Sequence, residues 1–318
     1  MTETNEQDMD RADRAPGQTE ASGRRYILSA HAFSAPPLEP ALYIVSTPIG
    51  NLGDITIRAL ETLAGASLIA CEDTRVTGTL VQRFGLKAPL MPYHEHNADK
   101  QRPKILDLLS RGEPVALVSD AGTPLISDPG YRLVRDVVEA GHKVIPIPGA
   151  SALLAGLVGA GLPSDTVLFA GFLPQKGGPK TARLKELGNI PATLVFYESP
   201  RRVGATLATM AEVLGGGREA AVARELTKRF ETFERGTLES LAETFSGDAP
   251  KGEIVILIGP PGEQAPADAA DAEVLLRLAL ETMPVSAAAK SVAKETGLDR
   301  NELYKQALEI KAGAESGT

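Results

Sequence analysis

Short apolar segments alternate with segments of helical periodicity across the first half of the chain. The apolar segments are only a few residues long, which predicts buried strands, and the longer segments place apolar side chains on one face of a helix. This strand and helix alternation predicts a largely parallel sheet with helices on both of its faces. The predicted strands are Ala41–Ser46, Ser67–Cys71, Val115–Ser119 and Lys143–Ile147, and the predicted helices are Ile55–Ala64, Val76–Phe84, Lys100–Ser110 and Tyr131–Ala140.

A second series of strands follows in the other half of the chain. Helical stretches near residues 200–213 and 237–244 separate the later strands, and residues 229–235 are expected to pair with the strand before them. The predicted strands are Val167–Ala170, Thr193–Tyr197, Ala220–Arg224 and Glu253–Ile258. We therefore expect an α/β fold of two α/β domains.

The two ends of the chain have a different composition. Residues 1–39 carry few apolar side chains, so we expect a disordered tail there. A linker rich in Pro, Gly, Ala and acidic residues precedes a segment whose pattern predicts helix, turn, helix. Asp299 is the predicted N-cap of the second of these helices, and Glu302, three residues later, completes a capping box. The expected divisions are 1–39 (tail), 40–148 and 149–260 (the two α/β domains), 261–272 (linker) and 273–318 (helical appendage).

Composition narrows the possible classes of protein. Cys71 is the single cysteine, so no disulfide forms within the chain, which favours a reducing cytoplasm. No run of about 18 apolar residues is present, so we expect no membrane span. The net charge of −8 argues against wholesale binding to nucleic acid. Residues 176–235 nevertheless hold 11 Lys and Arg against 7 Glu, a local net charge of +4, which indicates either a basic face or a mixed solvated surface.

Three loops rich in Gly and Pro follow predicted strands. They are TPIGNLGD at 47–54, SDAGTPLISDPG at 119–130 and PGASA at 148–152. Ligands of open parallel sheets bind beyond the carboxyl ends of the strands, so these loops predict a cleft. None of them is a dinucleotide fingerprint, and Pro179 interrupts the only sequence that resembles a phosphate-binding loop, at 177–181.

These loops, together with CEDTR (71–75), FYESPRR (196–202) and ARELTK (223–228), resemble the motifs of the tetrapyrrole methylase superfamily. The resemblance extends from about residue 41 to residue 259 and is closest to the branch that methylates ribosomal RNA. It implies a cleft between two domains that holds S-adenosyl-L-methionine, usually in a homodimer. The C-terminal helices resemble the helix-turn-helix appendage of that branch.

The resemblance also implies roles for individual residues. The loop at 119–130 corresponds to the one that approaches the methionine end of the cofactor, and Phe172 and Gly252 correspond to positions near its adenine. The cofactor residues implied in this way are Pro48, Gly50, Asp120, Gly122, Thr123, Ser151, Ala152, Phe172 and Gly252. The chain has S-D-A-G where many tetrapyrrole enzymes have G-D-P, which favours the ribosomal RNA branch.

The activity implied by this branch is methylation of the 2′-hydroxyl of a cytidine in the decoding region of 16S rRNA in the small ribosomal subunit. A positioned base or a cation that stabilises the developing alkoxide would assist such a reaction. The candidate catalytic residues are Glu72, Asp73, Arg75, Glu225 and Lys228, although Glu72–Arg75 equally fits a structural ion pair. The candidate RNA contacts are Lys176, Lys180, Arg201, Arg202 and Arg229, which would hold phosphates.

Other readings of the sequence predict different behaviour. A methylase of a small, tetrapyrrole-like molecule would have a deep cleft without a basic approach, and a non-catalytic nucleic-acid-binding protein would have no affinity for the cofactor. The two histidines of His94-Glu95-His96 lack a third ligand at a suitable spacing, so we expect no metal and interpret them as part of a polar loop that lines the substrate side.

Overall fold

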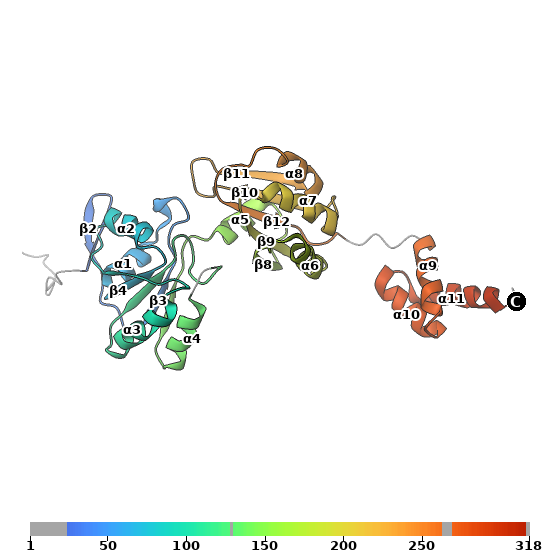
Figure 1. The fold of residues 1–318 in the computed structure, drawn as a ribbon, viewed down its shortest axis with the longest axis horizontal. Coiled ribbons are helices and arrows are strands. Elements are labelled where there is room, and N and C mark those ends of the chain that lie inside the picture. Colours follow the sequence, from blue (N-terminus) through green and yellow to red (C-terminus); the bar gives the residue numbers. More distant parts are fainter. Residues whose placement is uncertain (1–23, 128–129, 263–268, 316–318) are drawn as a thin grey trace, which may run out of the picture.

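The computed structural model describes residues 24–127, 130–262 and 269–315. Within them the chain forms two five-stranded sheets, a two-stranded hairpin and a group of three helices (Figure 1). The expected fold class, two α/β domains with a helical appendage, is confirmed.

The first sheet has the strand order β5-β4-β6-β3-β7 and is parallel throughout. Successive residues of its central strand β3 point to opposite faces: Tyr43 and Val45 belong to one buried cluster, and Leu42 and Ile44 to another. Both faces are therefore covered, which explains why its strands are uniformly apolar. Its elements are β3 (Leu42–Val45), η1 (Leu52–Asp54), α1 (Ile57–Gly65), β4 (Leu68–Cys71), α2 (Thr74–Arg83), β5 (Leu90–Pro92), α3 (Ala98–Ser110), β6 (Val115–Val118), α4 (Tyr131–Glu139) and β7 (Val144–Ile147).

The prediction of a disordered tail is wrong for residues 24–39. Strands β1 (Arg25–Leu28) and β2 (His31–Ser34) pair as an antiparallel hairpin, and α1 packs against β1. Tyr26 is buried and stacks on Phe33, and the Ile27 amide donates to the Phe84 carbonyl at 2.7 Å. Burial of one aromatic ring and attachment to the first domain's core offset the cost of ordering so polar a segment. Residues 1–23 lie outside the described residues.

The second sheet is mixed and has the order β11-β10-β12-β9-β8. Strand β8 pairs parallel with β9, whereas β12 is antiparallel to both β9 and β10. Strands β8, β9 and β10 therefore run in the same direction, and their carboxyl ends lie at the same edge. Its elements are α5 (Ala152–Ala160), β8 (Val167–Phe172), α6 (Gly177–Gly188), β9 (Thr193–Glu198), α7 (Val203–Leu214), β10 (Glu219–Arg224), β11 (Thr232–Thr237), α8 (Leu238–Thr244) and β12 (Ile254–Ile258).

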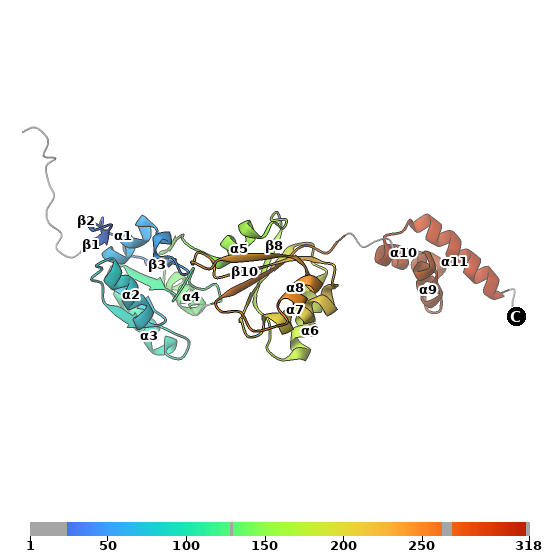
Figure 2. The ribbon, with the colours of Figure 1, turned by 90° about the horizontal axis from the view of Figure 1, so that it is seen from above.

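The C-terminal group comprises α9 (Ala269–Leu280), α10 (Val285–Thr296) and α11 (Arg300–Glu315), and it lies apart from the two sheets (Figure 2). Leu276, Val292 and Leu303 are among the residues of its own small core. Asp299 accepts hydrogen bonds from the amides of the second and third residues of α11, as expected for an N-cap. The predicted linker, 261–272, extends too far, because α9 already begins at Ala269. No helix among the described residues is long and apolar enough to cross a membrane.

Candidate functional site

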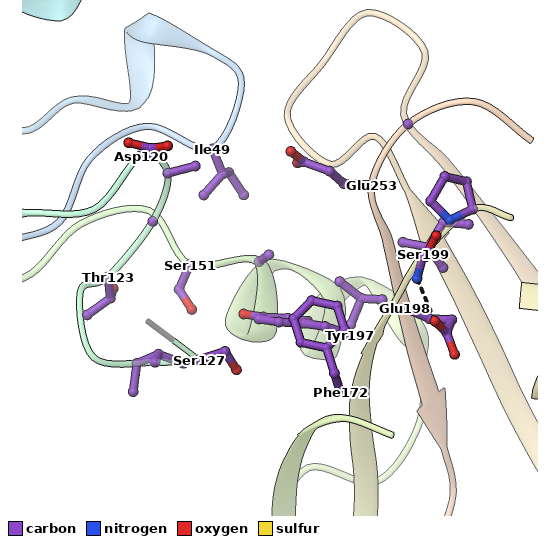
Figure 3. Close-up of a pocket in the computed structure, with 18 residues that line it drawn as sticks. Ile49, Asp120, Thr123, Ser127, Ser151, Phe172, Tyr197, Glu198, Ser199 and Glu253 are labelled. Carbon is purple, nitrogen blue, oxygen red and sulfur yellow. Dashed lines mark hydrogen bonds between the residues drawn. The ribbon is translucent and has the colours of Figure 1, made fainter. Parts of the chain in front are cut away.

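A cavity of about 420 Å³ lies between loops of the first domain and strand ends of the second (Figure 3). Asp120, Thr123 and Ser127 form one wall, from the loop that follows β6, and Ser151 lies beside them. The opposite wall is formed by residues at the ends of β8 and β9 and at the start of β12, namely Phe172, Tyr197, Glu198, Ser199, Pro200, Gly252, Glu253, Ile254 and Val255. Its volume falls within the usual range for small-molecule sites.

The first-domain loops are joined to each other by hydrogen bonds. The backbone groups of Thr47 and Gly122 exchange two hydrogen bonds, of 2.9 and 3.1 Å, and the hydroxyls of Ser46 and Thr123 lie 2.9 Å apart. Gly122 adopts φ +81°, a left-handed conformation that glycine adopts without strain. This wall is therefore preorganised before any ligand binds.

The second-domain wall is aromatic. Phe172 is 58% exposed although it is a large apolar side chain, and it packs edge-to-face on Tyr197 with ring centroids 5.7 Å apart. Phe169 supports Tyr197 from another side at 4.9 Å. Such a surface suits a planar heteroaromatic ring such as adenine.

The start of helix α5 faces the same cavity. Ser151 is the N-cap of α5, its side chain accepts from the amide of Leu154, and both Ser151 and Ala152 line the cavity. The amides at a helix N-terminus carry partial positive charge, so this end of the cavity favours a carboxylate. The cavity thus offers an aromatic wall for a base and a helix end for an acid.

A buried polar network, here called the Glu198 network, lies behind the aromatic wall. The Glu198 side chain is 1% exposed and accepts from the Ser199 amide (2.6 Å), Arg202 (3.0 Å) and the Thr206 hydroxyl (2.7 Å). The Lys180 ammonium is also buried and donates to the Thr206 hydroxyl at 3.1 Å. The network thus fixes the cavity-lining segment that follows β9.

The structure therefore corrects two of the predicted RNA contacts. Lys180 points into the protein within α6, and Arg202 donates to Glu198 and to the Leu173 carbonyl. The basic stretch of sequence in which both cations lie predicts RNA contacts, but their partners are acceptors of the second domain itself.

A second cluster of charges lies where the second domain contacts the first. The Lys228 ammonium donates to Glu225 at 2.8 Å and to Glu253 at 3.3 Å, and its aliphatic chain lies against Gly50. Burial lowers the pKa of Lys228, but the two carboxylates have the larger effect, so its pKa is raised overall. The hydrogen bond from Lys228 in turn lowers the pKa of Glu225. Gly50 and Pro48 line a neighbouring cavity of about 380 Å³ with Lys228, so these two predicted cofactor residues lie beside the main cavity rather than in it.

Asp73 and Arg75 form a surface ion pair at the start of α2. Asp73 is the N-cap of this helix, and its carboxylate receives three side-chain hydrogen bonds from Arg75, of 2.5 to 3.1 Å. The Arg75 hydrogen bonds lower the pKa of Asp73 to about 2. This geometry favours the interpretation of Asp73 and Arg75 as a structural ion pair. Glu72 lines another cavity, so the five candidate catalytic residues do not converge on one point.

Of the predicted cofactor residues, all except Pro48 and Gly50 line the main cavity: Asp120, Gly122, Thr123, Ser151, Ala152, Phe172 and Gly252. Ile49, Ser127, the segment after β9 and Glu253 also line the cavity, although their sequence context does not predict this. The rule that ligands lie beyond strand ends would have found that segment if it had been applied to the second sheet as well. No group of three or more His, Cys, Asp or Glu suited to a metal ion occurs among the described residues.

Comparison with protein families identifies residues 41–242 as matching the model described as tetrapyrrole (corrin/porphyrin) methylases. The chain belongs to this family. Residues 266–311 match a second model, the C-terminal helix-turn-helix domain of RsmI. The chain is thus an S-adenosylmethionine-dependent methyltransferase, and the non-catalytic alternative is wrong.

Similar proteins include ribosomal RNA small subunit methyltransferase I of Mesorhizobium japonicum, 55% identical over 278 residues, with 87% of this chain and 94% of the relative covered. The protein of that name from Pseudomonas aeruginosa is 46% identical, with 84% of this chain and 96% of the relative covered. Among solved structures, the cobalt precorrin-4 methyltransferase CbiF aligns with a TM-score of 0.53 at 18% identity, covering 69% of this chain and 95% of that one. That likeness establishes the fold alone.

Proposed function

We propose that this methyltransferase transfers a methyl group to the 2′-hydroxyl of a cytidine in the decoding region of 16S rRNA, at a site of the cytidine 1402 type. The observation that carries this proposal is the similarity to ribosomal RNA small subunit methyltransferases I, which extends over nearly the whole length of those relatives. The small ribosomal subunit would be the partner, and the cytoplasm the compartment.

The main cavity is the proposed methyl-donor site. Its aromatic wall, formed by Phe172 and Tyr197, would take the adenine, and the first-domain wall would take the methionine end. There the N-terminus of α5 at Ser151 suits the α-carboxylate, and Asp120 suits the α-ammonium. When bound, S-adenosylmethionine supplies an electrophilic methyl group on a sulfonium.

The contribution of the protein to the reaction is chiefly positioning. In-line displacement needs the acceptor oxygen held close to the methyl carbon, and fixed walls provide that without reorganisation. The hydrogen bonds between Thr47 and Gly122 hold one wall, and the Glu198 network holds the other. Glu225 and Lys228 remain candidates for charge stabilisation, although their ion pair lies in the neighbouring cavity.

Three of the predicted RNA contacts lie at one edge of the second sheet. Lys176, Arg201 and Arg229 follow the carboxyl ends of β8, β9 and β10, which meet beside the donor cavity. Arg201 comes directly after the cavity residue Pro200. We infer that these three cations bind phosphates near the acceptor nucleotide and do not themselves discriminate between bases.

A homodimer is also proposed. Helix α5 is apolar on all sides: Leu157 and Ala160 pack on the second sheet, whereas Leu154 and Val158 are 57% and 82% exposed. A helix that is apolar all round is normally buried, so a second copy of the chain is expected to cover its outer face. Sedimentation velocity of Val158→Glu tests this, and a wild-type monomer at micromolar concentration would contradict it.

The activity itself is tested by transfer of tritiated methyl groups to small subunits from a strain that lacks the homologous enzyme. Label is expected in the 16S rRNA, at one cytidine whose 3′-phosphodiester becomes resistant to alkaline cleavage. Subunits from the parent strain, already methylated, are the matched control. Absence of label in the RNA, or label on a base, would refute the proposal.

A further inference from the structure

A third cavity, of about 620 Å³, opens beside the donor site in the first domain. It lies where β4 and β5 end and α4 begins, and it meets the donor cavity at Ser127, which lines both. Its lining residues are Glu72, Tyr93, His94, Glu95, His96, Ala98, Asp99, Ser127, Gly130, Tyr131 and Arg132. An acceptor bound there would therefore lie next to the group that it attacks.

One aromatic side chain of this cavity is available for stacking. Tyr131, the first residue of α4, is 69% exposed, whereas Tyr93, the other tyrosine that lines the cavity, is buried. Exposed aromatic rings at RNA-binding sites stack on unpaired bases, because every base presents a flat π face. Burial of Tyr131 against a base would also remove apolar surface that water now contacts.

The polar groups of the cavity suit a base rather than a phosphate. Among the described residues that line it, Glu72, Glu95 and Asp99 contribute carboxylates and Arg132 contributes a guanidinium. Carboxylates repel a phosphodiester but accept hydrogen bonds from an exocyclic amine, and acidic side chains pair in this way with the N4 amine of cytosine. Uracil presents an oxygen acceptor at the same position and would face the carboxylate unfavourably.

The loop that carries Glu95 is held in shape by hydrogen bonds. The Asn97 side chain accepts from the His94 amide at 3.0 Å, donates to the Pro92 carbonyl at 3.0 Å and contacts the His94 ring nitrogen Nε2 at 3.1 Å. The rings of His94 and His96 pack edge-to-face, with centroids 6.0 Å apart. Asp99 already accepts from Arg102 at 2.9 Å, so of Asp99 and Glu95 the latter is the better placed acceptor for a ligand.

On these grounds, and resting on the proposed function, we propose that this cavity binds the base of the acceptor cytidine. Tyr131 stacks on the pyrimidine, Glu95 accepts a hydrogen bond from its exocyclic amine, and the ribose points past Ser127 toward the donor. The His94-Glu95-His96 segment thus contributes to base selection, and Glu95 is a specificity-determining residue.

The test of Tyr131 compares variants of α4 in methylation of undermethylated small subunits. Tyr131→Ala should lower kcat/KM for subunits by about tenfold or more, since base stacking on one aromatic ring has an effect of this size. Tyr131→Phe should restore most of the activity, and calorimetry should show unchanged affinity for S-adenosylhomocysteine in both variants. The matched control is Val138→Ala, an exposed apolar truncation at the other end of the same helix. If Tyr131→Ala is as active as Val138→Ala, the stacking role is wrong.

The test of Glu95 uses subunits in which the target cytidine is replaced by uridine. Wild-type enzyme should prefer cytidine, and Glu95→Gln should narrow this preference at least about tenfold, because an amide can donate to the uracil oxygen. Glu139→Gln, at the far end of α4, is the control. An unchanged preference in Glu95→Gln overturns the assignment of Glu95. Failure of the wild type on cytidine subunits would instead count against the proposed function.

Discussion

Thr206→Val provides the sharpest test of how the second domain supports the donor site. The Thr206 hydroxyl accepts from Lys180 and donates to Glu198, and the residue is fully buried. Valine keeps the shape of the side chain but makes neither hydrogen bond. The Lys180 ammonium then loses its hydrogen bond to this hydroxyl, and Glu198 retains those from the Ser199 amide and Arg202.

The expected cost follows from those two hydrogen bonds. Each involves a charged group, and such bonds contribute about 1.5–3 kcal/mol. Lys180 is 7% exposed and can shift toward water, which recovers part of the loss. We therefore expect Thr206→Val to lower the free energy of local opening of this region by about 2–3 kcal/mol in all. A change of this size speeds amide exchange through local opening by roughly 30- to 160-fold.

Hydrogen exchange with mass spectrometry measures this effect for peptides from α6, β9 and α7. Thr209→Val is the matched control, because Thr209 lies on the same helix, is only partly buried, and its hydroxyl donates to the Ala205 carbonyl in a solvent-exposed hydrogen bond. The double variant Lys180→Met/Thr206→Val should recover part of the loss, since neither partner is then left buried and unsatisfied. If Thr206→Val speeds exchange no more than Thr209→Val does, the reasoning about the network is refuted.

Three further predictions concern single positions. Asp120→Ala should weaken binding of S-adenosylhomocysteine in calorimetry by about tenfold, through loss of one charge-assisted contact and of the hydrogen bond from the Asp73 amide; unchanged affinity would exclude Asp120 from the donor site. Arg201→Ala should weaken RNA binding and leave thermal stability unchanged, whereas Arg202→Ala should lower stability because it exposes the Glu198 network; equal effects of the two on filter binding would contradict this distinction. Because the pKa of Asp73 is lowered in the folded protein, its contribution to stability is complete above its unfolded pKa of about 4 and is lost as pH falls through about 2. In an NMR titration, Arg75→Ala should return the midpoint of Asp73 toward its ordinary value. An unmoved midpoint would show that Arg75 does not cause the lowered pKa.

The sequence predicted the elements whose signal is local. Uniformly apolar runs and the turns after them predicted β3, β4, β6 and β7 of the first sheet and the loop at 119–130, whereas the edge strand β5 was not predicted, because it is only three residues long and partly exposed. The hairpin at residues 25–34 was missed because its second strand is exposed along its whole length. Its stability comes from Tyr26 packing against the first domain's core.

The errors in the candidate site have a different physical origin. Helix α6 opens with Gly177-Gly178-Pro179, which looks like a loop, so Lys180 was not placed on a helix with an inward face. Its partner Thr206 and the acceptor Glu198 are distant in sequence, and one sequence taken alone does not reveal that pairing. A count of basic residues cannot distinguish a cation that faces solvent, such as Arg201, from one that neutralises a buried carboxylate.

The division of the donor cavity between two separate cores has a thermodynamic consequence. Each sheet has its own hydrophobic clusters, so heating the protein without cofactor is expected to melt the two domains in distinguishable steps. A ligand that needs both walls binds only when both domains are folded. At a free concentration one hundred times its dissociation constant, it raises the free energy of unfolding of the two domains together by about 2.7 kcal/mol. The methyl donor would then make the two domains unfold together, so that calorimetry of the bound protein shows one transition in place of two.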